Sequence, residues 1–218
     1  MDGRDGFDIH LRRETEADHP AVEALTRQAF WNVHRPGCDE PYLVHVMRAH
    51  ADFRPDLDFV AEVDGRVVGH IAYTRSHLVA ADGAALETLT FGPLSVLREF
   101  QRRGVGKALI AHTMALAAAE GCPAVVIFGN PTDYASSGFQ GCAPHRVGLE
   151  DGRHPTALLV RVLRPGALAG HAWTFQESAV YHVDPQAAET YDARFPPLEK
   201  GYRSSQEVFA ILSRSFVE

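Results

Sequence analysis

The alternation of apolar and polar residues is clearest in two neighbouring segments, 57–63 and 66–74, which predict paired β-strands. They flank Asp64-Gly65, a dipeptide that strongly favours the two-residue turn of a β-hairpin. The unbroken apolar run 124–128 is typical of a strand buried on both faces. The remaining pattern predicts strands over 9–12, 86–97 and 156–163, helices over 15–29, 39–47 and 105–121, a short helix around Tyr134, and two short helices opening at Asp184 and Ser205.

The segment 94–110 carries the most distinctive pattern in the chain. It reads as the end of a strand, a tight basic turn containing Gly104 and Gly106, and the start of an alanine-rich helix. Such a turn directs several backbone N–H groups toward one point at the positive end of a helix. This arrangement predicts a site for a diphosphate.

Two common phosphate-binding motifs do not fit the spacing. A nucleoside-triphosphate P-loop requires glycine five residues before its Gly-Lys pair and Ser or Thr after it, but Gln101 and Ala108 stand at those places. A dinucleotide-binding fingerprint requires a small residue where Leu109 stands, and an acidic residue at the end of the next strand, where residues 123–128 contain none. A nucleotide-binding α/β protein is therefore the least favoured alternative.

The spacing Gln101-x-x-Gly104-x-Gly106 resembles the acetyl-coenzyme A pyrophosphate loop of the GNAT superfamily of N-acetyltransferases. A second similarity lies at 130–139, where Tyr134 stands four residues before a Gly-Phe pair. The two signatures occur at the distance expected in that superfamily, and the resemblance extends from about residue 9 to 163. Within the superfamily the chain is most similar to the predicted bacterial YhbS-like acetyltransferases.

The resemblance implies an α/β (α+β) fold with a mixed, mostly antiparallel, GNAT-like central sheet whose central strands splay apart, flanked by helices. Pro93 marks the place where strand 86–97 loses a neighbour, because proline cannot donate to a neighbouring strand. In the superfamily the pantetheine arm of the cofactor inserts there, and the freed backbone of residues 94–96 would pair with it. We expect an acetyltransferase domain over 1–165 and a C-terminal extension over 166–218. The extension packs on the domain, covers the acceptor cleft or meets a second subunit.

The resemblance also assigns roles to individual residues. The residues expected to contact the cofactor are Leu94, Ser95, Val96, Gln101, Arg102, Arg103, Gly104, Val105, Gly106, Lys107, Asn130 and Tyr134. The backbone N–H of Val96 is the candidate for stabilising the oxyanion, and Tyr134 is the candidate general acid for the departing thiolate. Asn130 either contacts the cofactor or caps the following turn. Glu87 is the candidate general base, acting through water, with Glu40 and His70 as competitors.

Composition limits the partners further. The formal charge of −7 argues against a nucleic-acid surface, and the clustered basic residues surround the proposed phosphate turn. The first six residues lack the apolar core of a signal peptide, and no apolar run reaches the length of a membrane span. The three cysteines show no zinc spacing. These features favour a reduced, cytoplasmic protein without a nucleic-acid or membrane partner.

The segment 31–50 contains several side chains that bind metals in other proteins. His45 and His50 are five residues apart, which places them off a common helical face, and no His-Glu-x-x-His occurs. We therefore expect no metal site. Trp31, Cys38 and Tyr42 are instead expected to shape the acceptor pocket.

The favoured function is acetyl-coenzyme A-dependent N-acetylation of a primary amine on a small molecule, by direct transfer in a ternary complex. Acetylation of a protein amine is less favoured. The alternative from another class is a non-catalytic acyl-coenzyme A-binding sensor that keeps the phosphate turn without the chemistry. A homodimer is also plausible, and the acceptor itself has no motif.

Overall fold

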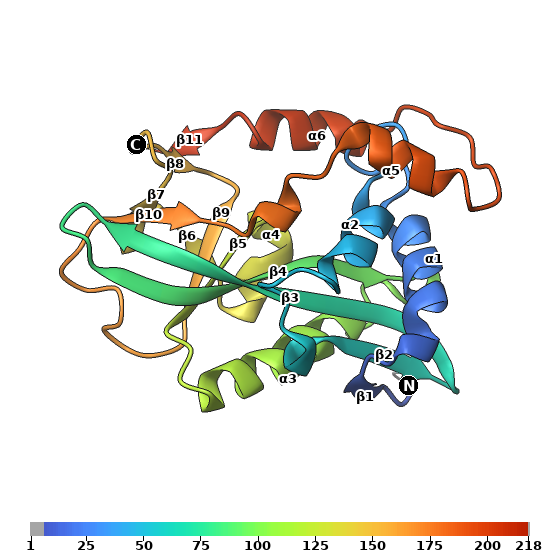
Figure 1. The fold of residues 1–218 in the computed structure, drawn as a ribbon, viewed down its shortest axis with the longest axis horizontal. Helices are drawn as coiled ribbons and strands as arrows, with labels where there is room; N and C mark the ends of the chain where they lie inside the picture. Colours follow the sequence, from blue (N-terminus) through green and yellow to red (C-terminus); the bar gives the residue numbers. More distant parts are fainter. Residues whose placement is uncertain (1–6, 218) are drawn as a thin grey trace, which may run out of the picture.

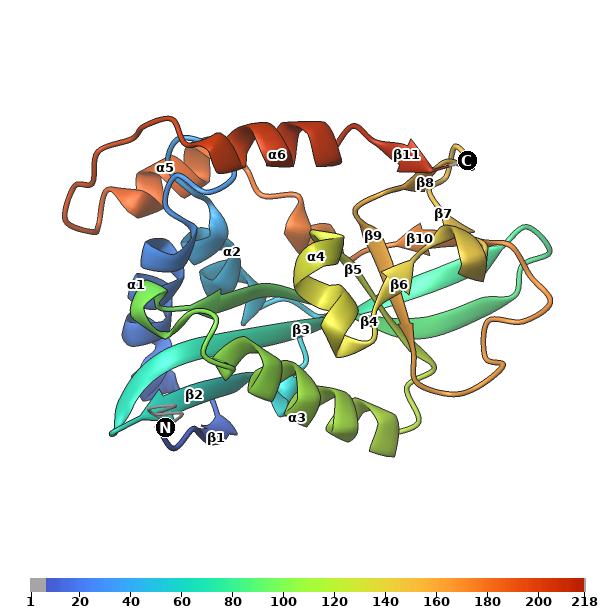
Figure 2. The same ribbon diagram turned by 180° about the vertical axis from the view of Figure 1, so that it is seen from behind.

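The computed structural model describes residues 7–217, and its elements surround one mixed sheet (Figures 1 and 2). The strands are β1 (His10–Arg13), β2 (Phe59–Val63), β3 (Arg66–Ala80), β4 (Ala85–Val96), β5 (Ala124–Phe128), β6 (Gln140–Gly141), β7 (Val147–Gly148), β8 (His154–Pro155), β9 (Leu158–Val162), β10 (Trp173–Gln176) and β11 (Phe216–Val217). The helices are α1 (His19–Phe30), α2 (Glu40–Met47), α3 (Val105–Ala119), α4 (Pro131–Tyr134), α5 (Pro185–Asp192) and α6 (Ser204–Leu212). The sheet runs in the order β1-β2-β3-β4-β5-β9-β6, β10 joins β3 and β7, and β8 and β11 form a separate pair.

The long strand β3 organises the sheet. One edge of β3 pairs with β2 near its start and with β10 near its end, and the other edge pairs antiparallel with β4. Only β4 with β5 and β7 with β10 run parallel among the described strands. The mixed, mostly antiparallel sheet expected from the sequence is thereby confirmed.

The central strands β4 and β5 separate almost at once. They pair at a single position, Leu89 with Val125, and β4 then continues to Val96 alongside β3 alone. We call the gap beyond this pair the opening. The expectation about Pro93 needs a correction. Strand β4 stays paired with β3 on both sides of Pro93, across a bulge. The neighbour that β4 loses is β5, and it loses it directly after Leu89. A proline fits here because a bulge leaves its residue outside the regular ladder.

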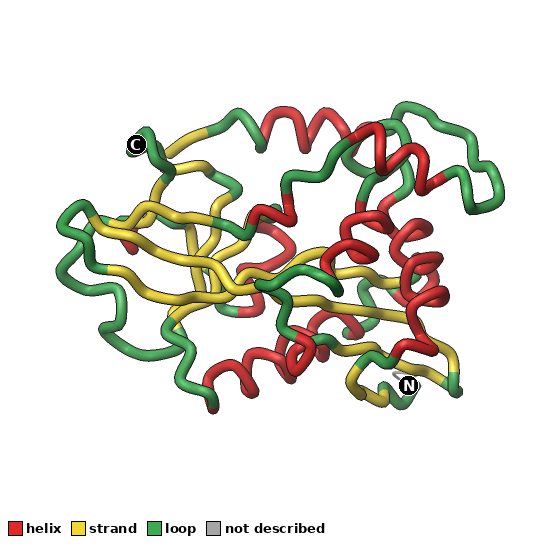
Figure 3. Tube along the Cα trace, in the orientation of Figure 1, coloured by secondary structure: helices red, strands yellow, loops and turns green. Residues whose placement is uncertain are grey.

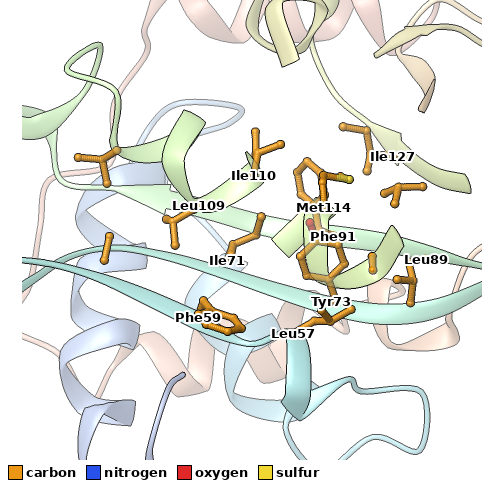
Figure 4. Packing of buried hydrophobic residues seen from close by; sticks show 14 of the residues in the cluster. Leu57, Phe59, Ile71, Tyr73, Leu89, Phe91, Leu109, Ile110, Met114 and Ile127 are labelled. Carbon is orange, nitrogen blue, oxygen red and sulfur yellow. The ribbon is translucent and has the colours of Figure 1, made fainter. Parts of the chain in front are cut away.

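Helix α3 packs on one face of the sheet and forms the main core with β2 to β5 (Figure 4). The alternation within β4 sends Leu89 and Phe91 into this core. Gly69 of β3 allows the close contact, since a Cβ there would lie 2.7 Å from Val105 Cγ1 of α3. The first turn of α3 is therefore fixed against the sheet, next to β4.

Helices α1 and α2 and the helices of the C-terminal segment lie on the side of the sheet away from α3 (Figure 3). The C-terminal segment contributes β10 to the sheet, and α6 then runs from the side of α5 to β11 (Figures 1 and 2). At its start Ser205 Oγ donates to the Val33 carbonyl at 2.8 Å, and at its end the Thr156 N–H donates to the Ser215 carbonyl at 2.9 Å. These two hydrogen bonds join the C-terminal segment to the loop after α1 and to the residue after β8. The division of the chain at residue 165 stays a prediction.

Several boundaries differ from the expected ones. The first helix begins at His19 rather than at Thr15, because residues 16–18 form a 3₁₀ turn and Pro20 suits only the first turn of an α-helix. Strand β3 continues to Ala80 rather than ending at 74, because β4 pairs with it as far as Val79 and β10, distant in sequence, pairs with residues 77–80. The two-residue strands were not expected, because a segment of two residues is too short to show an alternation of apolar and polar positions.

Candidate functional site

The basic turn closes directly on the first residue of α3. Gly104 is the N-cap of this helix with φ +95°, and Arg102 also has a positive φ of 56°. The Gly104 carbonyl accepts from the Ala108 N–H at 2.9 Å, which starts the helical ladder. The first N–H groups of a helix have no partner within it, so those of the turn are available to a ligand. Glycine is required at position 104 because of its positive φ and not because of space, since a Cβ there would meet no atom within 4 Å.

The basic residues around the turn have different tasks. Arg98 donates to the Trp31 carbonyl at 3.2 Å, and the guanidinium of Arg103 lies 4.3 Å from the ring centre of Phe7. The side chains of Arg102 and Lys107 are exposed and make no ion pair within residues 7–217. They are therefore the cations best placed to meet a bound anion.

The end of β4 presents part of its backbone to the opening. The Leu97 N–H donates to the Val68 carbonyl of β3 at 2.9 Å, and successive residues of a strand direct their backbone groups to opposite edges. Leu94 and Val96 therefore face the opening, whereas Ser95 faces β3. The Ser95 hydroxyl is also buried and donates to Thr26 at 2.9 Å. Of residues 94–96, only Leu94 and Val96 can pair with an inserted ligand, which removes Ser95 from the expected contacts.

Gln101 and Gly106 shape the corner between β4 and α3. The Gln101 side chain donates through Nε2 to the Val96 carbonyl at 3.0 Å, which ties the turn to the strand. A Cβ on Gly106 would lie 3.7 Å from both Leu94 and Val96, in the space between strand and helix. The corner thus combines open backbone N–H groups, a helix N-terminus and a position where a side chain would fill the space. These properties fit the pantetheine and diphosphate of coenzyme A.

Tyr134 lies beside the opening on the α3 face. Its ring centre is 5.7 Å from that of Phe91 in β4, and Gly129 makes room for it, since a Cβ there would lie 2.5 Å from the Tyr134 ring. Burial raises the pKa of Tyr134 to about 12, so its hydroxyl keeps its proton at neutral pH. No side chain within residues 7–217 hydrogen-bonds this hydroxyl. Gly129 was not singled out in the sequence analysis. The available signal was a glycine directly before Asn130.

A model of the acetyltransferase (GNAT) family matches residues 27–140, more than half of the chain. The chain belongs to this family. The matched range contains the turn, the end of β4 and Tyr134, so the resemblance given by the two sequence signatures is confirmed.

Relatives of known structure share the fold along most of this acetyltransferase. The crystal structure of YhbS from Escherichia coli in complex with CoA superposes with a TM-score of 0.70 at 25% identity, covering 82% of this chain and 94% of YhbS. A GNAT acetyltransferase from Brucella melitensis in complex with acetyl-CoA gives a TM-score of 0.62 at 25% identity, covering 81% and 99% of the two chains. A curated relative is the uncharacterized N-acetyltransferase YjhQ of Escherichia coli K12, 36% identical over 90 residues, which are 41% of this chain and 49% of YjhQ. The match thus spans about half the length of that relative.

Asn130 acts as a cap in this GNAT structure. Its side-chain oxygen accepts from the Thr132 N–H at 3.1 Å and from the Thr132 hydroxyl at 2.9 Å, at the start of α4. The sequence left two roles open for Asn130, and the described contacts show the capping role. A contact between its amide nitrogen and the cofactor stays a prediction.

The three candidate bases lie on different elements. Glu87 is on β4 before the opening, with its side chain 58% exposed and 3.7 Å from Arg75 Nε. Glu40 lies at the start of α2 and contacts His34 at 3.2 Å. His70 is fully buried, and burial lowers its pKa to about 4. Only Glu87 is both on β4 and open to solvent, and its role stays a prediction.

Of the three residues expected to shape the acceptor pocket, Trp31 and Tyr42 contact the C-terminal extension. Trp31 Nε1 donates to the Glu199 carbonyl at 2.9 Å, and the Tyr42 ring packs against Tyr191 of α5 at 5.5 Å. Cys38 and Trp31 line a small cavity of about 180 Å³ together with α5. Burial raises the pKa of the Cys38 thiol to about 12, which disfavours a nucleophilic thiolate.

Histidines of segment 31–50 have separate partners: His34 contacts Glu40, His45 contacts Glu23 and His50 contacts Asp52. Within residues 7–217, the group with atoms close enough to share a metal is Glu14, Asp58 and His70. His70 Nε2 already lies 2.7 Å from Asp58 Oδ1, and Arg48 donates to both oxygens of Glu14 at 2.6 and 3.0 Å. His70 and Arg48 are thus already the hydrogen-bond partners of these two carboxylates. Among the described helices, none is long and apolar enough to cross a membrane.

Proposed function

We propose that the protein transfers an acetyl group from acetyl-coenzyme A to a primary amine of a small molecule, directly in a ternary complex. The observation that carries the proposal is the corner formed by Gly104, Gly106 and the free edge of β4. Two relatives with the same fold were crystallised with CoA or acetyl-CoA, which supports this ligand for the corner. Backbone N–H groups of the turn hold the diphosphate, and Arg102 and Lys107 add positive charge.

Positioning of the thioester supplies most of the rate enhancement. Holding two reactants in a reactive geometry is worth about 7–11 kcal/mol, whereas general acid–base catalysis typically contributes about 10²–10⁴-fold. The pantetheine amides pair with Leu94 and Val96 in place of the missing strand. The thioester then lies in the opening, within reach of Tyr134.

The chemistry follows from the groups at the opening. The neutral amine nitrogen attacks the thioester carbonyl carbon, and a backbone N–H at the free edge of β4 stabilises the oxyanion of the tetrahedral intermediate. The carbon–sulfur bond then breaks, and the leaving thiolate takes the proton of the Tyr134 hydroxyl. The amine proton passes through water to Glu87. The products are the acetylated amine and free coenzyme A.

The site is tested by Gly104→Asp with Gly83→Asp as the matched control. Both glycines have positive φ, +95° and +89°, and a Cβ at either meets no atom within 4 Å, so the backbone cost is similar. Only Gly104→Asp places a negative charge against the diphosphate. We expect it to weaken CoA binding at least 100-fold by calorimetry, while Gly83→Asp binds like the wild type.

Turnover is measured as thiol release from acetyl-coenzyme A with a library of amines, small molecules and peptides. Release with small amines supports the proposal, and release with peptides alone indicates a protein acetyltransferase. CoA binding without release by any amine indicates a sensor. Normal CoA binding by Gly104→Asp would show that the ligand lies elsewhere.

A further inference from the structure

The opening connects two different faces of the sheet. Leu89 and Phe91 of β4 point into the core beneath α3, on the face that also carries Tyr134. Thr90, between them, points to the other face, because side chains alternate along a strand. Thr90 is the first residue of β4 beyond its only pair with β5, so it stands at the edge of the opening.

Thr90 carries a buried hydroxyl that has no hydrogen-bond partner in the described part of the chain. Its side chain is 3% exposed. Its cross-strand neighbour Thr74 lies on the same face and donates to the Tyr181 hydroxyl at 3.4 Å, and Tyr181 donates to the Gly92 carbonyl at 3.3 Å. The C-terminal extension therefore covers this side of the opening. An unpaired buried hydroxyl costs stability, which favours a ligand as its partner.

A cavity of about 660 Å³ lies at the end of β10. It is lined by Phe175 and Glu177 at the end of β10, by His182, and by Glu150 in the loop after β7. Phe175 packs edge-to-face on Phe128, the last residue of β5, at 6.0 Å between ring centres. His182 directly follows Tyr181, which contacts β4. Two lining residues are thus linked to the strands that border the opening, Phe175 by its contact with β5 and His182 through its neighbour Tyr181.

The charges around the cavity are mostly negative. Glu177 is half-buried, with its side chain 26% exposed, and its ion-pair contact is His182 Nε2 at 3.6 Å. Glu150 is exposed, while Asp151 is neutralised by Arg153 at 2.6 Å. A half-buried carboxylate beside an aromatic ring suits an organic cation, which interacts with both groups.

We propose that this cavity is the acceptor site of the acetyltransferase, and that the acceptor is a small amine carrying a second, positively charged group that binds at Glu177 and Glu150. The inference rests on the proposed function. The reacting nitrogen must be neutral and reach the opening beside Thr90, so the group held by the carboxylates is a different one. The Thr90 hydroxyl accepts from, or donates to, the reacting amine.

The sheet geometry sets the length of the acceptor. Glu177 follows Gln176, which pairs with His77, so it stands about level with Thr88 and two strands away from β4. Two strand spacings of about 4.8 Å and two residues of about 3.3 Å place Glu177 roughly 12 Å from Thr90, measured between backbones. With both side chains reaching inward, a linear diamine of the length of cadaverine spans the gap.

The test compares cadaverine, pentylamine and aminovalerate, which share one reacting amine and differ in a positive, absent or negative second group. We expect KM for cadaverine to be at least tenfold below that for pentylamine, and aminovalerate to be the poorest substrate. Glu177→Gln and Glu150→Gln should each bring the ratio of the two KM values toward one. Glu16→Gln, which removes the same charge from an exposed 3₁₀ turn near α1, should leave the ratio unchanged.

Calorimetric titration of cadaverine into the CoA-saturated protein separates the two proposals. Binding that is lost in Glu177→Gln, without turnover of any amine, would support the acceptor site and contradict the enzyme. Turnover of pentylamine without a preference for cadaverine, or an equal loss of preference in Glu16→Gln, would overturn the acceptor site and leave the enzyme intact.

Discussion

The two sides of the opening are assembled from different kinds of sequence. The cofactor side comes from one stretch, in which the end of β4, the turn and α3 follow each other within residues 94–119. The acceptor side brings together Thr90, the loop after β7, and β10 with the segment that follows it. A continuous stretch has fixed spacing that a motif can encode, while the acceptor side depends on the packing of distant segments.

The two sides also differ in how their polar groups are satisfied. On the cofactor side the turn is tied internally, by Gln101 to Val96 and by Arg98 to Trp31. On the acceptor side Thr90 has no described partner, and Glu177 has an exposed histidine 3.6 Å away. The first side is prepared for one ligand of known shape. The second depends on its ligand to complete its hydrogen bonds and charges.

The largest effect is expected for Tyr134→Phe. Removing the acid of the cofactor side should lower kcat by about 10²–10⁴-fold, the range typical of general acid–base catalysis. The affinity for CoA should change less than twofold, because the phenyl ring keeps its packing on Phe91. The measurements are thiol release at saturating substrates and calorimetric titration of CoA.

Tyr202→Phe is the matched control, since Tyr202 is 69% exposed and lies in the extension. It should retain the wild-type kcat. Full activity of Tyr134→Phe would remove Tyr134 from the chemistry and assign protonation of the thiolate to water.

The fold and the family could be predicted from the sequence, because the signals on the cofactor side are local. The two glycines of the turn and the tyrosine before Gly138-Phe139 sufficed for the fold and the family. The spacing of the motif residues could not show which residues at the end of β4 direct their backbone groups to the opening. This orientation depends on the register with β3, and it selects Leu94 and Val96 over Ser95.

The acceptor side could not be predicted because its residues have ordinary local patterns. Trp31 and Tyr42 looked distinctive in the sequence, yet their described contacts are with the extension. Tyr181 and Glu177 lie in a segment without a motif and gain their position only when β10 pairs with β3. A polar residue at the centre of a strand, such as Thr90, was the one available signal.

A smaller effect is expected for Thr90→Val, which should raise the stability of the protein and lower its activity. The change keeps the shape and removes a buried unpaired hydroxyl, which should raise the free energy of unfolding by about 1–3 kcal/mol. Loss of one hydrogen bond to the acceptor should lower kcat/KM by about tenfold. Thermal unfolding and thiol release with cadaverine measure the two changes.

Thr88→Val is the control on the same strand and face. Its hydroxyl is paired with Ser76 at 2.9 Å, so this variant leaves Ser76 unpaired and should be less stable than the wild type. A Thr90→Val variant that is destabilised in the same way would mean that its hydroxyl has a structural partner, and the acceptor side would lose its buried contact.

The smallest expected effect is a pH dependence that separates the two sides. Burial raises the pKa of Glu177, only partly opposed by His182, so this carboxylate gains its proton at a higher pH than an ordinary glutamate. Its charge is present above that raised pKa and is lost as the pH falls through it. The KM of cadaverine relative to pentylamine should therefore rise a few-fold as the pH falls toward the range in which ordinary glutamates titrate, and less so in Glu177→Gln.

On the cofactor side the same comparison predicts no change. Because burial raises the pKa of Tyr134 to about 12, the acid stays protonated, and kcat should not fall between about pH 7 and 10. Using the ratio of two amines cancels their own ionisation, so an acidic limb in the ratio reports on the carboxylates. Asp151 with Arg153, His182 and Glu150 also face the cavity, and Glu150→Gln separates the contribution of Glu150. An alkaline fall of kcat with an apparent pKa below about 10 would show that Tyr134 is not the titrating acid, since its burial shifts it in the other direction.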